Sequence, residues 1–426
     1  MSHFPLMSSL VSPRERPMIP LFLTAFIDLL GLGIAIPVLA IVFFDTNLSI
    51  LPADTPLATR SLLYGLLVGS YPLAQFFGAP ILGALSDRYG RKPTLLVPLL
   101  GTSIGYVLFA IGLQTHDLPL LFFSRILDGF AGGSLSIVLS SVADISRNPA
   151  VKTRNFGIIG MAFGLGFILG PYIGGKLSDP AVLPWFTFST PFLAAGALAA
   201  INMLLCMAVF RETLTKRIQS PISPLTGLRN LRKAFTLGHV RTMFIVVFLM
   251  ALGFNFFTQF FQLFLIERFA FTQVDIGELF AYAGLWIAIT QGLLTPAMAR
   301  RFSPNSIFLW SSLLLGLSFP LLLLPTSTYQ LYIIIPILAI FQGLSQPPAN
   351  TIISDLSARD SQGEIMGINQ SVQAMAMALP PILGGMIVSV HFTLPIFAAS
   401  LLTVVAWLIF VVFFRHKPQQ ELFHEE

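Results

Sequence analysis

Long apolar stretches, each about the length of a membrane-crossing helix, follow one another along almost the whole chain. A helix needs roughly 20 apolar residues to cross the hydrocarbon core of a bilayer, and polar segments that are mostly short separate the stretches. The pattern therefore predicts an all-α integral membrane protein with twelve transmembrane helices. The predicted spans are residues 19–43, 61–85, 94–113, 119–142, 155–177, 191–210, 242–266, 276–298, 306–325, 330–352, 364–389 and 394–414.

The composition agrees with lipid as the solvent for most of the chain. Of the 426 residues, 55% are hydrophobic and only 10% are charged, whereas a soluble domain carries about 25% charged residues. The mean hydropathy is +0.82. The net charge of +5 does not indicate a nucleic-acid partner, because the basic residues lie in short loops between apolar runs. A single cysteine, Cys206, excludes a disulfide framework.

The distribution of Lys and Arg predicts which side of the membrane each loop faces. If both termini are cytoplasmic, 20 of the 24 Lys and Arg residues fall in segments on the inside. Only Arg60, Lys176 and Arg268 fall outside, and Arg125 lies within a span. Because cytoplasmic loops carry an excess of positive charge, we expect a multi-pass inner-membrane protein with both termini in the cytoplasm. No removable signal peptide is evident at the start of the sequence.

One long polar segment and a repeated pattern divide the chain into two halves. Residues 211–241 are rich in Arg, Lys, Ser and Pro, and they predict a cytoplasmic central loop. It would join an N-terminal six-helix bundle, residues 1–210, to a C-terminal six-helix bundle with a short cytoplasmic tail, residues 242–426. A matching pattern in both halves predicts a pseudo-twofold axis and a central substrate cavity. The matching residues are Asp144, Gly157, Pro171, Gly174 and Gly175, and Asp355, Gly367, Pro381, Gly384 and Gly385.

The loop after the second span, GALSDRYGRKP (residues 83–93), combines an acid, three bases and a tight turn at Gly90. The bases alone would suit a cytoplasmic loop, but Asp87 has no use in setting topology. An acid there can rest on the N-terminus of a neighbouring helix, which contributes about 0.3–1 kcal/mol, or ~2 kcal/mol when partly buried. Arg88 and Arg91 can pair with acids on another helix. We interpret Gly83 and these four residues as a gating loop whose contacts hold one conformation and break in the other.

One acid in the first predicted span needs a reason to be there. A charge at the bilayer centre costs about 2.5–3.5 kcal/mol on insertion scales. Asp28 shares a helix face with Thr24, Gly31 and Ala35, and we interpret it as a protonation site that faces the cavity. The structural alternative is an acid that stays neutral and hydrogen-bonded.

The fourth span carries a same-helix pair, Arg125 and Asp128, on a stripe of small and polar residues. Arg does not lose its proton, so Asp128 is the titratable partner. Its paired Arg favours the ionised carboxylate, and withdrawal of Arg125 by a substrate anion or a helix movement would let Asp128 bind a proton. We therefore predict proton coupling through Asp28, Asp128 and Arg125. Close helix packing is the structural alternative for the small residues. The stripe continues through Gly129, Gly132, Gly133, Ser136 and Ser140.

The second half supplies uncharged polar stripes on the seventh, tenth and eleventh spans, each at the spacing of one helix face. We expect them to line the substrate cavity. Hydrogen bonds between helices, worth ~0.6 kcal/mol each, are the alternative, and for the eleventh span the two readings stand equal. A cavity of neutral amides with one or two acids suits a modestly polar ligand that is neutral or cationic. The predicted cavity residues are Asn255, Gln259, Gln262, Gln342, Gln346, Asn350 and Gln373.

Several motifs together resemble the major facilitator superfamily. Residues 83–93 resemble its signature loop, residues 28–40 (DLLGLGIAIPVLA) its opening motif, and residues 125–133 (RILDGFAGG) its fourth-span motif. GLGFILGPYIGG, residues 164–175, looks like the antiporter motif of drug/proton exporters. With ADIS and NFG, the resemblance is strongest to the tetracycline-resistance exporters. It implies the major facilitator fold and proton-coupled export of an amphipathic small molecule or drug by alternating access. The candidate antiporter-motif residues are Gly166, Gly170, Pro171 and Gly174.

The chain departs from the tetracycline exporters where that group handles its drug. Those exporters carry an acid in the third span, where this chain has Gly105, and a histidine in the eighth, where it has Leu285, Trp286 and Ile287. They also carry an acid in the ninth span, where this chain has none. Tetracycline itself is therefore not the expected substrate. A dedicated metabolite, siderophore or nutrient transporter on the same fold, an importer included, stays the alternative.

Enzyme chemistry has no support in the sequence. There is no nucleotide fingerprint such as GxxxxGK[ST] and no nucleophile–base pair or metal cluster, and all six histidines lie in termini or loops. We therefore expect no enzyme activity, no cofactor, no metal site and no nucleic-acid partner. The expected partners are a small-molecule substrate, protons and membrane lipid, and we expect the chain to function as a monomer.

Overall fold

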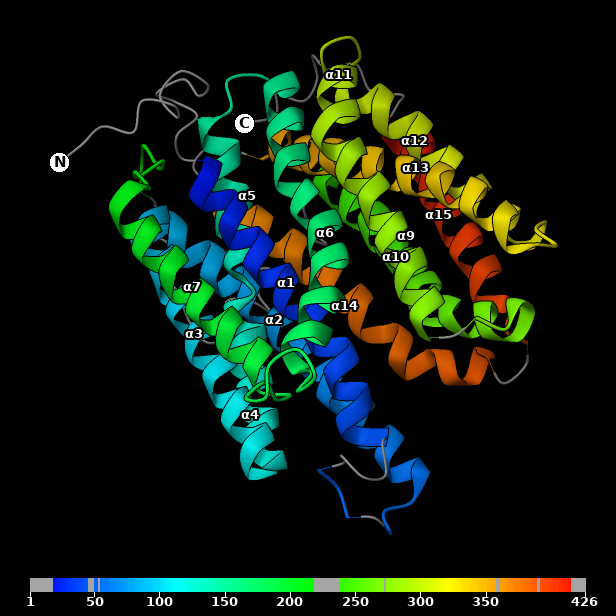
Figure 1. The fold of residues 1–426 in the computed structure, drawn as a ribbon. Helices are drawn as coiled ribbons and strands as arrows, with labels where there is room; N and C mark the ends of the chain where they lie inside the picture. Colours follow the sequence, from blue (N-terminus) through cyan, green and yellow to red (C-terminus); the bar gives the residue numbers. More distant parts are fainter. Residues whose placement is uncertain are drawn as a thin grey trace.

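The computed structural model describes residues 18–44, 50–52, 54–217, 238–271, 273–357, 361–388 and 391–414, and all regular structure in these residues is helical. Figure 1 shows the helices in two groups, which we name the amino-terminal bundle and the carboxyl-terminal bundle. The amino-terminal bundle consists of α1 (Met18–Phe44), α2 (Leu57–Tyr89), α3 (Arg91–Thr115), α4 (Leu118–Ala131), α5 (Ser134–Ile145), α6 (Pro149–Ser178) and α7 (Thr190–Val209). The carboxyl-terminal bundle consists of α9 (Gly238–Phe269), α10 (Gln273–Ile289), η1 (Thr290–Leu294), α11 (Thr295–Ala299), α12 (Pro304–Ser318), η2 (Pro320–Leu323), α13 (Thr328–Asp355), α14 (Gln362–Val388) and α15 (Leu394–Phe414).

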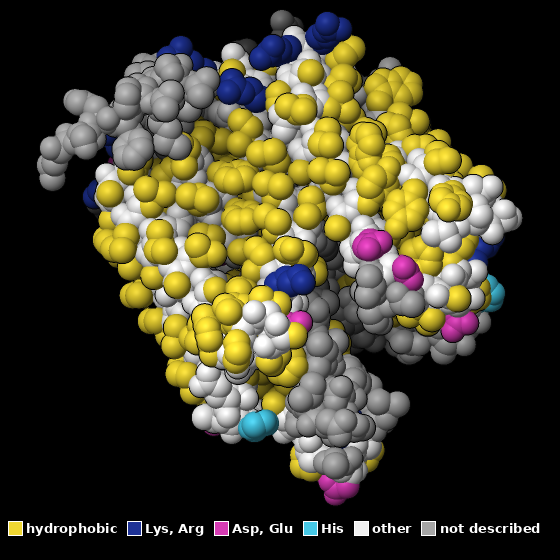
Figure 2. All heavy atoms as spheres, in the orientation of Figure 1, with side chains coloured by type: hydrophobic (Ala, Val, Ile, Leu, Met, Phe, Trp, Pro, Cys, Tyr) yellow, Lys and Arg dark blue, Asp and Glu magenta, His cyan; other side chains and the backbone are white. Residues whose placement is uncertain are grey.

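Each predicted span corresponds to one helix or to a helix with one interruption. Among the described residues, ten helices are long and apolar enough to cross a membrane. The other two predicted spans are α1 and α14, each 27 residues long. Hydrophobic side chains cover much of the outer surface (Figure 2), and Leu293, Ile333 and Leu401 are 71%, 69% and 65% exposed. A surface this apolar suits lipid rather than water, and the predicted all-α, twelve-span architecture is confirmed.

Local sequence sets several of the helix starts. The side chain of Asn148 accepts a hydrogen bond from the backbone N–H of Val151 at 2.9 Å, and Pro149 occupies the first helical position of α6. Asp117 caps α4 through the N–H of Leu120 at 3.0 Å. These caps satisfy backbone donors that the helix itself leaves free, and Pro at the first position lacks the donor that would otherwise stay unpaired.

Two spans are interrupted in ways that the hydrophobic pattern does not reveal. The fourth span breaks between α4 and α5 at Gly132 and Gly133, and Gln75 of α2 donates to the carbonyl of Gly132 at 3.0 Å. The eighth span widens into a π-helical turn, η1, before it continues as α11. Such turns are uncommon and often mark functional sites. Because the fourth span breaks at Gly132 and Gly133, its polar stripe is carried by two helices, α4 and α5.

The predicted central loop is only partly described. Residues 211–217 are not helical, residues 218–237 lie outside the described part of the chain, and α9 begins at Gly238. The tail after Phe414 also lies outside it, as do the side-chain surroundings of residues 381–390, which include Pro381, Gly384 and Gly385 of the repeat. The predicted domain boundaries therefore stay predictions.

The two bundles meet along two interfaces. In the first interface, α2 and α5 pack on the start of α14; in the second interface, the first half of α6 packs on α10, η1, α11 and the end of α13. We call the end of the molecule where α2 ends and α14 begins the basic end, because Lys and Arg side chains gather there in Figure 2. The largest hydrophobic core is continuous across both bundles. Towards the opposite end, the described surfaces of the two bundles part (Figure 2).

Candidate functional site

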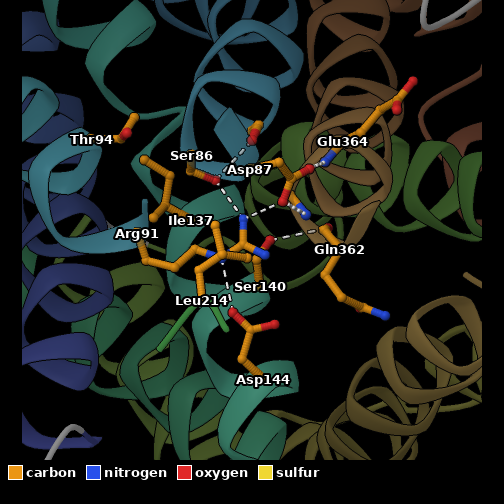
Figure 3. Close-up of polar contacts among 12 residues, drawn as sticks. Ser86, Asp87, Arg91, Thr94, Ile137, Ser140, Asp144, Leu214, Gln362 and Glu364 are labelled. Atoms are coloured by element: carbon orange, nitrogen blue, oxygen red, sulfur yellow. Dashed lines mark hydrogen bonds and ion pairs between the residues drawn. The ribbon is translucent and has the colours of Figure 1, made fainter. Parts of the chain in front are cut away.

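Asp87 is the centre of a polar network at the basic end (Figure 3). Its carboxylate accepts hydrogen bonds from the backbone N–H groups of Gly363 at 2.9 Å and Glu364 at 2.7 Å, the first turn of α14. The carboxylate also accepts a hydrogen bond from Arg91 Nη1 at 2.5 Å, and Asp87 is only 5% exposed to solvent. A carboxylate of one bundle thus caps a helix of the other, where the positive end of the helix dipole favours an anion.

Arg91, the first residue of α3, links this cap on α2 to Asp144 of α5 within the amino-terminal bundle. The residue is fully buried; its Nε donates to Asp144 at the end of α5 at 2.9 Å, and its Nη1 donates to Ser86 at 2.7 Å. Buried charge pairs are strongly destabilised when one partner is removed. The predicted contacts of Asp87 with a helix N-terminus and of Arg91 with an acid on another helix are both present, whereas the gating role itself stays a prediction.

The other predicted gating residues surround this network. Gly83 packs its backbone directly on that of Gly363, with no room for a Cβ. Gly90 has a φ of 109°, a region that side chains disfavour, and it makes the turn between α2 and α3. The guanidinium of Arg88 lies 5.3 Å from the ring centre of its neighbour Tyr89.

Sequence reasoning missed Glu212, which lies just beyond α7. Its carboxylate accepts from the backbone N–H of Arg91 at 2.9 Å and of Lys92 at 3.2 Å, so it caps the start of α3. Gln362 was missed as well; its backbone carbonyl accepts from Ser140 at 3.1 Å, and its side chain bonds Ser354. Neither residue belongs to a motif, and only the fold brings each beside the gating loop.

The second interface closes differently at the basic end. Lys152 of α6 donates to the carboxylate of Asp355, the last residue of α13, and to Ser354 at 3.0 Å. One turn away, the hydroxyls of Thr153 and Thr351 lie 2.8 Å apart. The side chain of Asp355 is 37% exposed, so water weakens this ion pair.

The three predicted proton-coupling residues lie buried within the amino-terminal bundle. Asp28 is 8%, Asp128 4% and Arg125 3% exposed. The hydroxyl of Ser134 donates to Asp28 at 2.6 Å, and Arg125 Nη1 lies 3.8 Å from Asp128. With both acids ionised, this cluster would hold two negative charges against one positive charge, so one added proton would make it neutral.

Aromatic rings hold Arg125 in place. Its guanidinium lies 5.4 Å from the ring centre of Tyr71 and 5.5 Å from that of Phe109, which is cation–π distance. Its Nε is buried without a hydrogen-bond partner among the described residues. The predicted ion pair with Asp128 is therefore present at a long distance, 3.8 Å, and the Nε–H group of Arg125 remains available to a hydrogen-bond acceptor.

The antiporter-motif residues pack α6 on α1. Gly170 meets the backbone of Gly33, while Gly166 meets Leu29 and Gly174 meets Ile34. Pro171 lies between Gly170 and Gly174 in the sequence and is half-buried. Because Asp28 precedes Leu29 on α1, the motif lies directly beside the acid cluster. Three other glycines of α6 face the carboxyl-terminal bundle instead: Gly157, Gly160 and Gly164.

The predicted cavity residues are not all placed alike. Gln342 lines a cavity of about 540 Å³, open to solvent, between α9, α10 and α13. Gln346 and Asn350 line a smaller one of about 300 Å³ between the bundles. Gln373 accepts a hydrogen bond from Gln346 at 3.0 Å.

The three candidates on α9 border neither of these cavities. Asn255 donates to the carbonyl of Ala251 in its own helix at 2.8 Å, Gln259 is exposed and Gln262 is half-buried. For these three residues, the cavity-lining role stays a prediction. Among the described residues there is no group of three or more His, Cys, Asp or Glu side chains that could hold a metal ion.

Comparison with known proteins places this geometry in a wider context. The family model described as Major Facilitator Superfamily matches residues 21–309 and 243–426. The chain is 30% identical over 387 residues to the tetracycline resistance protein, class C, of Escherichia coli, with 91% of each chain covered. It is 26% identical over 403 residues to the quinolone resistance protein NorA of Staphylococcus aureus (strain MSSA476), covering 94% of this chain and 97% of that protein.

A solved structure agrees in fold. The crystal structure of the human organic anion transporter MFSD10 matches with a TM-score of 0.78 at 24% identity, covering 94% of this chain and all of that one. The resemblance to the superfamily and to its tetracycline-resistance proteins, drawn above from motifs, is confirmed.

Proposed function

The chain belongs to the major facilitator superfamily and is thus a multi-pass inner-membrane transporter and not an enzyme, and we propose that it exports an amphipathic small molecule or drug in exchange for protons. The observation that carries the proposal is the buried cluster of Asp28, Arg125 and Asp128. Relatives named for resistance to tetracycline and quinolone support efflux as the direction.

Charge imbalance in the cluster gives the proton a place to bind. An unpaired buried charge is expensive; Arg125 lies 3.8 Å from Asp128, whereas Asp28 accepts a hydrogen bond from the neutral hydroxyl of Ser134. A proton on either acid removes the excess negative charge. Withdrawal of Arg125 by a helix movement raises the proton affinity of Asp128, whereas a cargo that brings a positive charge or hydrogen-bond donors to either acid favours the ionised carboxylate and lowers its proton affinity. Proton binding and cargo binding then compete for the same electrostatic balance, which is what coupling requires.

Helix α6 links this cluster to the rest of the molecule. One set of its glycines lies against α1 next to Asp28, and the other lies against α10 and η1 of the opposite bundle. A change at Asp28 that shifts α1 can therefore be transmitted to the second interface by α6 alone. Pro171 removes one backbone donor and permits α6 to bend between the two surfaces.

We propose that the basic end faces the cytoplasm, in line with the excess of Lys and Arg in the loops of that side. The interfaces close that end, so the structure corresponds to the state open towards the outside, from which cargo leaves and protons enter. One proton crossing a potential of 100 mV is worth about 2.3 kcal/mol. That amounts to roughly a fortyfold cargo gradient at ~1.4 kcal/mol per decade.

Reconstitution tests the proposal. Purified protein in liposomes with an imposed pH gradient is expected to move (naphthylmethyl)trimethylammonium, a fluorescent probe with an uncharged ring pair and a permanent positive charge outside the rings, against its gradient. Asp28→Asn and Asp128→Asn are expected to abolish the response to the pH gradient, while Asp179→Asn, an exposed acid at the end of α6, leaves it intact. Unchanged pH-driven transport in both cluster variants would remove these acids from the mechanism.

A second candidate is a dedicated transporter of an organic anion on the same fold. It is favoured by one observation, the buried Nε of Arg125 that has no hydrogen-bond partner among the described residues. A carboxylate of the cargo could accept from it. Counterflow of labelled benzoate that is lost in Arg125→Lys, with (naphthylmethyl)trimethylammonium not transported by the wild type, would favour this candidate over the drug exporter.

A further inference from the structure

The larger cavity lies wholly within the carboxyl-terminal bundle, between α9, α10 and α13. Its walls carry four phenylalanines, Phe254, Phe257, Phe261 and Phe280. The ring centres of Phe257 and Phe261 lie 4.5 Å apart, and those of Phe261 and Phe280 lie 6.2 Å apart at nearly a right angle. Rings in these arrangements offer both faces and edges to a further aromatic ring.

Among the residues that the structure describes, no Asp, Glu, Lys, Arg or His lines this cavity. The buried Asp28, Arg125 and Asp128 all belong to the other bundle. A charge placed among the phenylalanines would lose water and find no counter-ion, and for a cation the ring faces would offset only part of that cost. The walls therefore select against a charged ring system.

Two polar groups are placed to orient a ligand. The carboxamide of half-buried Gln342 has no hydrogen-bond partner among the described residues, so it can both donate and accept. The hydroxyl of Thr258 donates to the carbonyl of Asn255 at 3.3 Å and keeps an acceptor site. A carbonyl, hydroxyl or ring nitrogen of a ligand fits this pair.

The cavity also borders the moving part of the molecule. Gly284, one of its lining residues, packs on Gly164 of α6 at the second interface. On α13, Gln342 is followed at four-residue spacing by Gln346 and Asn350, which line the smaller cavity between the bundles. One helix face thus leads from the larger cavity to the smaller one.

We propose that this cavity is the cargo subsite of the carboxyl-terminal bundle, and that it takes a flat, uncharged aromatic portion of the cargo held by one hydrogen bond to Gln342. The inference rests on the proposed export function and specifies the cargo class for it. The cavity is open to solvent on one side, so a flat ring can lie against its phenylalanines while the rest of the cargo stays outside. Charge on the cargo, where present, lies outside this subsite.

A matched pair of probes tests the subsite. Acridine at mildly alkaline pH is uncharged, whereas N-methylacridinium has the same rings with a permanent positive charge. Fluorescence titration of the full chain in lipid nanodiscs is expected to show acridine binding at least about tenfold tighter. Gln342→Ala should weaken acridine binding about fivefold, as the loss of one hydrogen bond predicts, and Phe280→Ala about tenfold. Gln342→Glu should reverse the preference towards the cation.

Control variants keep the test decisive. Gln114→Ala on α3 and Phe413→Ala on α15, both exposed side chains outside the cavity, should bind acridine as the wild type does. Equal affinity for the two probes, together with no reversal in a folded Gln342→Glu protein, would overturn the proposal.

The outcome is separable from that of the export function. Loss of pH-driven transport with the probe preference intact would refute export but not the subsite. Intact pH-driven transport with Phe280→Ala indistinguishable from Phe413→Ala in acridine binding would refute the subsite but not export.

Discussion

Corresponding segments of the two halves form the two interfaces between the bundles, but different interactions hold each interface closed. In the first interface, buried Asp87 caps α14 and pairs with Arg91. In the second interface, the corresponding segment is TPAMARRFSP (residues 295–304), which has Ala299 in the position of Asp87. The N-terminus of α6 is capped there by Asn148, the residue directly before the helix, and not by a side chain of the opposite bundle. Closure there depends on glycine contacts and on the partly exposed pair of Lys152 and Asp355.

The difference assigns the two interfaces different tasks. A buried, fully engaged carboxylate acts as an on–off contact, because partial separation leaves charges without partners. Close glycine packing has no such threshold, and small shifts of one backbone over another change its energy gradually. We expect the first interface to set which state is populated, and the second to guide the movement between the states.

The largest expected effect breaks the first interface. Asp87→Asn keeps the shape but removes the charge that caps α14 and balances Arg91. Loss of a buried partner costs about 3–5 kcal/mol, so the basic end should open and transport should fall more than tenfold. Spin labels at Tyr89→Cys and Phe302→Cys, two exposed positions at that end, in a Cys206→Ser background would report the longer distance.

The control for this variant is Asp117→Asn, the same change at an exposed cap inside one bundle. It should leave the distance between the labels unchanged. An Asp87→Asn protein with the wild-type distance distribution would show that the charge does not hold the interface closed.

An intermediate effect compares packing in the two interfaces directly. A Cβ on Gly83 would meet the backbone of Gly363, and one on Gly164 would lie 2.9 Å from the Cβ of Ala288 and closer still to backbone atoms. Overpacking of this kind costs about 1–3 kcal/mol. Gly83→Ala should increase the accessibility of the basic end to a thiol reagent at Tyr89→Cys in the same Cys206→Ser background, whereas Gly164→Ala should slow transport with that accessibility little changed.

Gly175→Ala is the matched control, since nothing lies within 4 Å of a Cβ there. If Gly83→Ala opens the molecule and Gly164→Ala only slows transport, the division of tasks between the interfaces is supported. Both variants behaving like Gly175→Ala would contradict it.

The smallest expected effect concerns the ion pair of the second interface. Lys152→Gln should destabilise the closed state by less than about 1 kcal/mol, because Asp355 is partly exposed. The effect should shrink as salt rises, whereas that of Asp87→Asn should not. Lys176→Gln, an exposed lysine at the opposite end of α6, is the reference. A salt-insensitive, tenfold loss of transport in Lys152→Gln would instead make the two interfaces alike.

Much of the architecture could be predicted because the bilayer fixes the length of each apolar stretch. The tenth span, predicted as 330–352, is α13 at Thr328–Asp355, and the twelfth, 394–414, is α15 with the same limits. The break at Gly132 and Gly133 and the π-helical turn at Thr290–Leu294 could not be read in this way. Both interrupt the backbone without changing the hydrophobicity around them.

The candidate site was predictable to a different degree in each part. Asp28, Arg125 and Asp128 stand out because a charge inside a span is rare, and all three are buried within one bundle. The amides stand out less, since a Gln or Asn on a helix face serves a cavity and an interhelical bond equally well. Gln342 lines a cavity without a hydrogen-bond partner among the described residues, while Gln346 both lines the smaller cavity and donates to Gln373. Glu212 carried no signal at all.

By itself, the sequence determined how many helices cross the membrane, approximately where they start and end, which residue types lie on each helix face, and the family. Those features follow from hydrophobic length, caps and spacing, which are local. The tertiary structure alone decided which neighbour each face meets: one set of glycines on α6 lies against α1 and another against α10, and Asp87 lies at the start of α14. The rotation of a helix about its axis depends on packing with residues far away in the chain, and spacing along one helix does not contain that information.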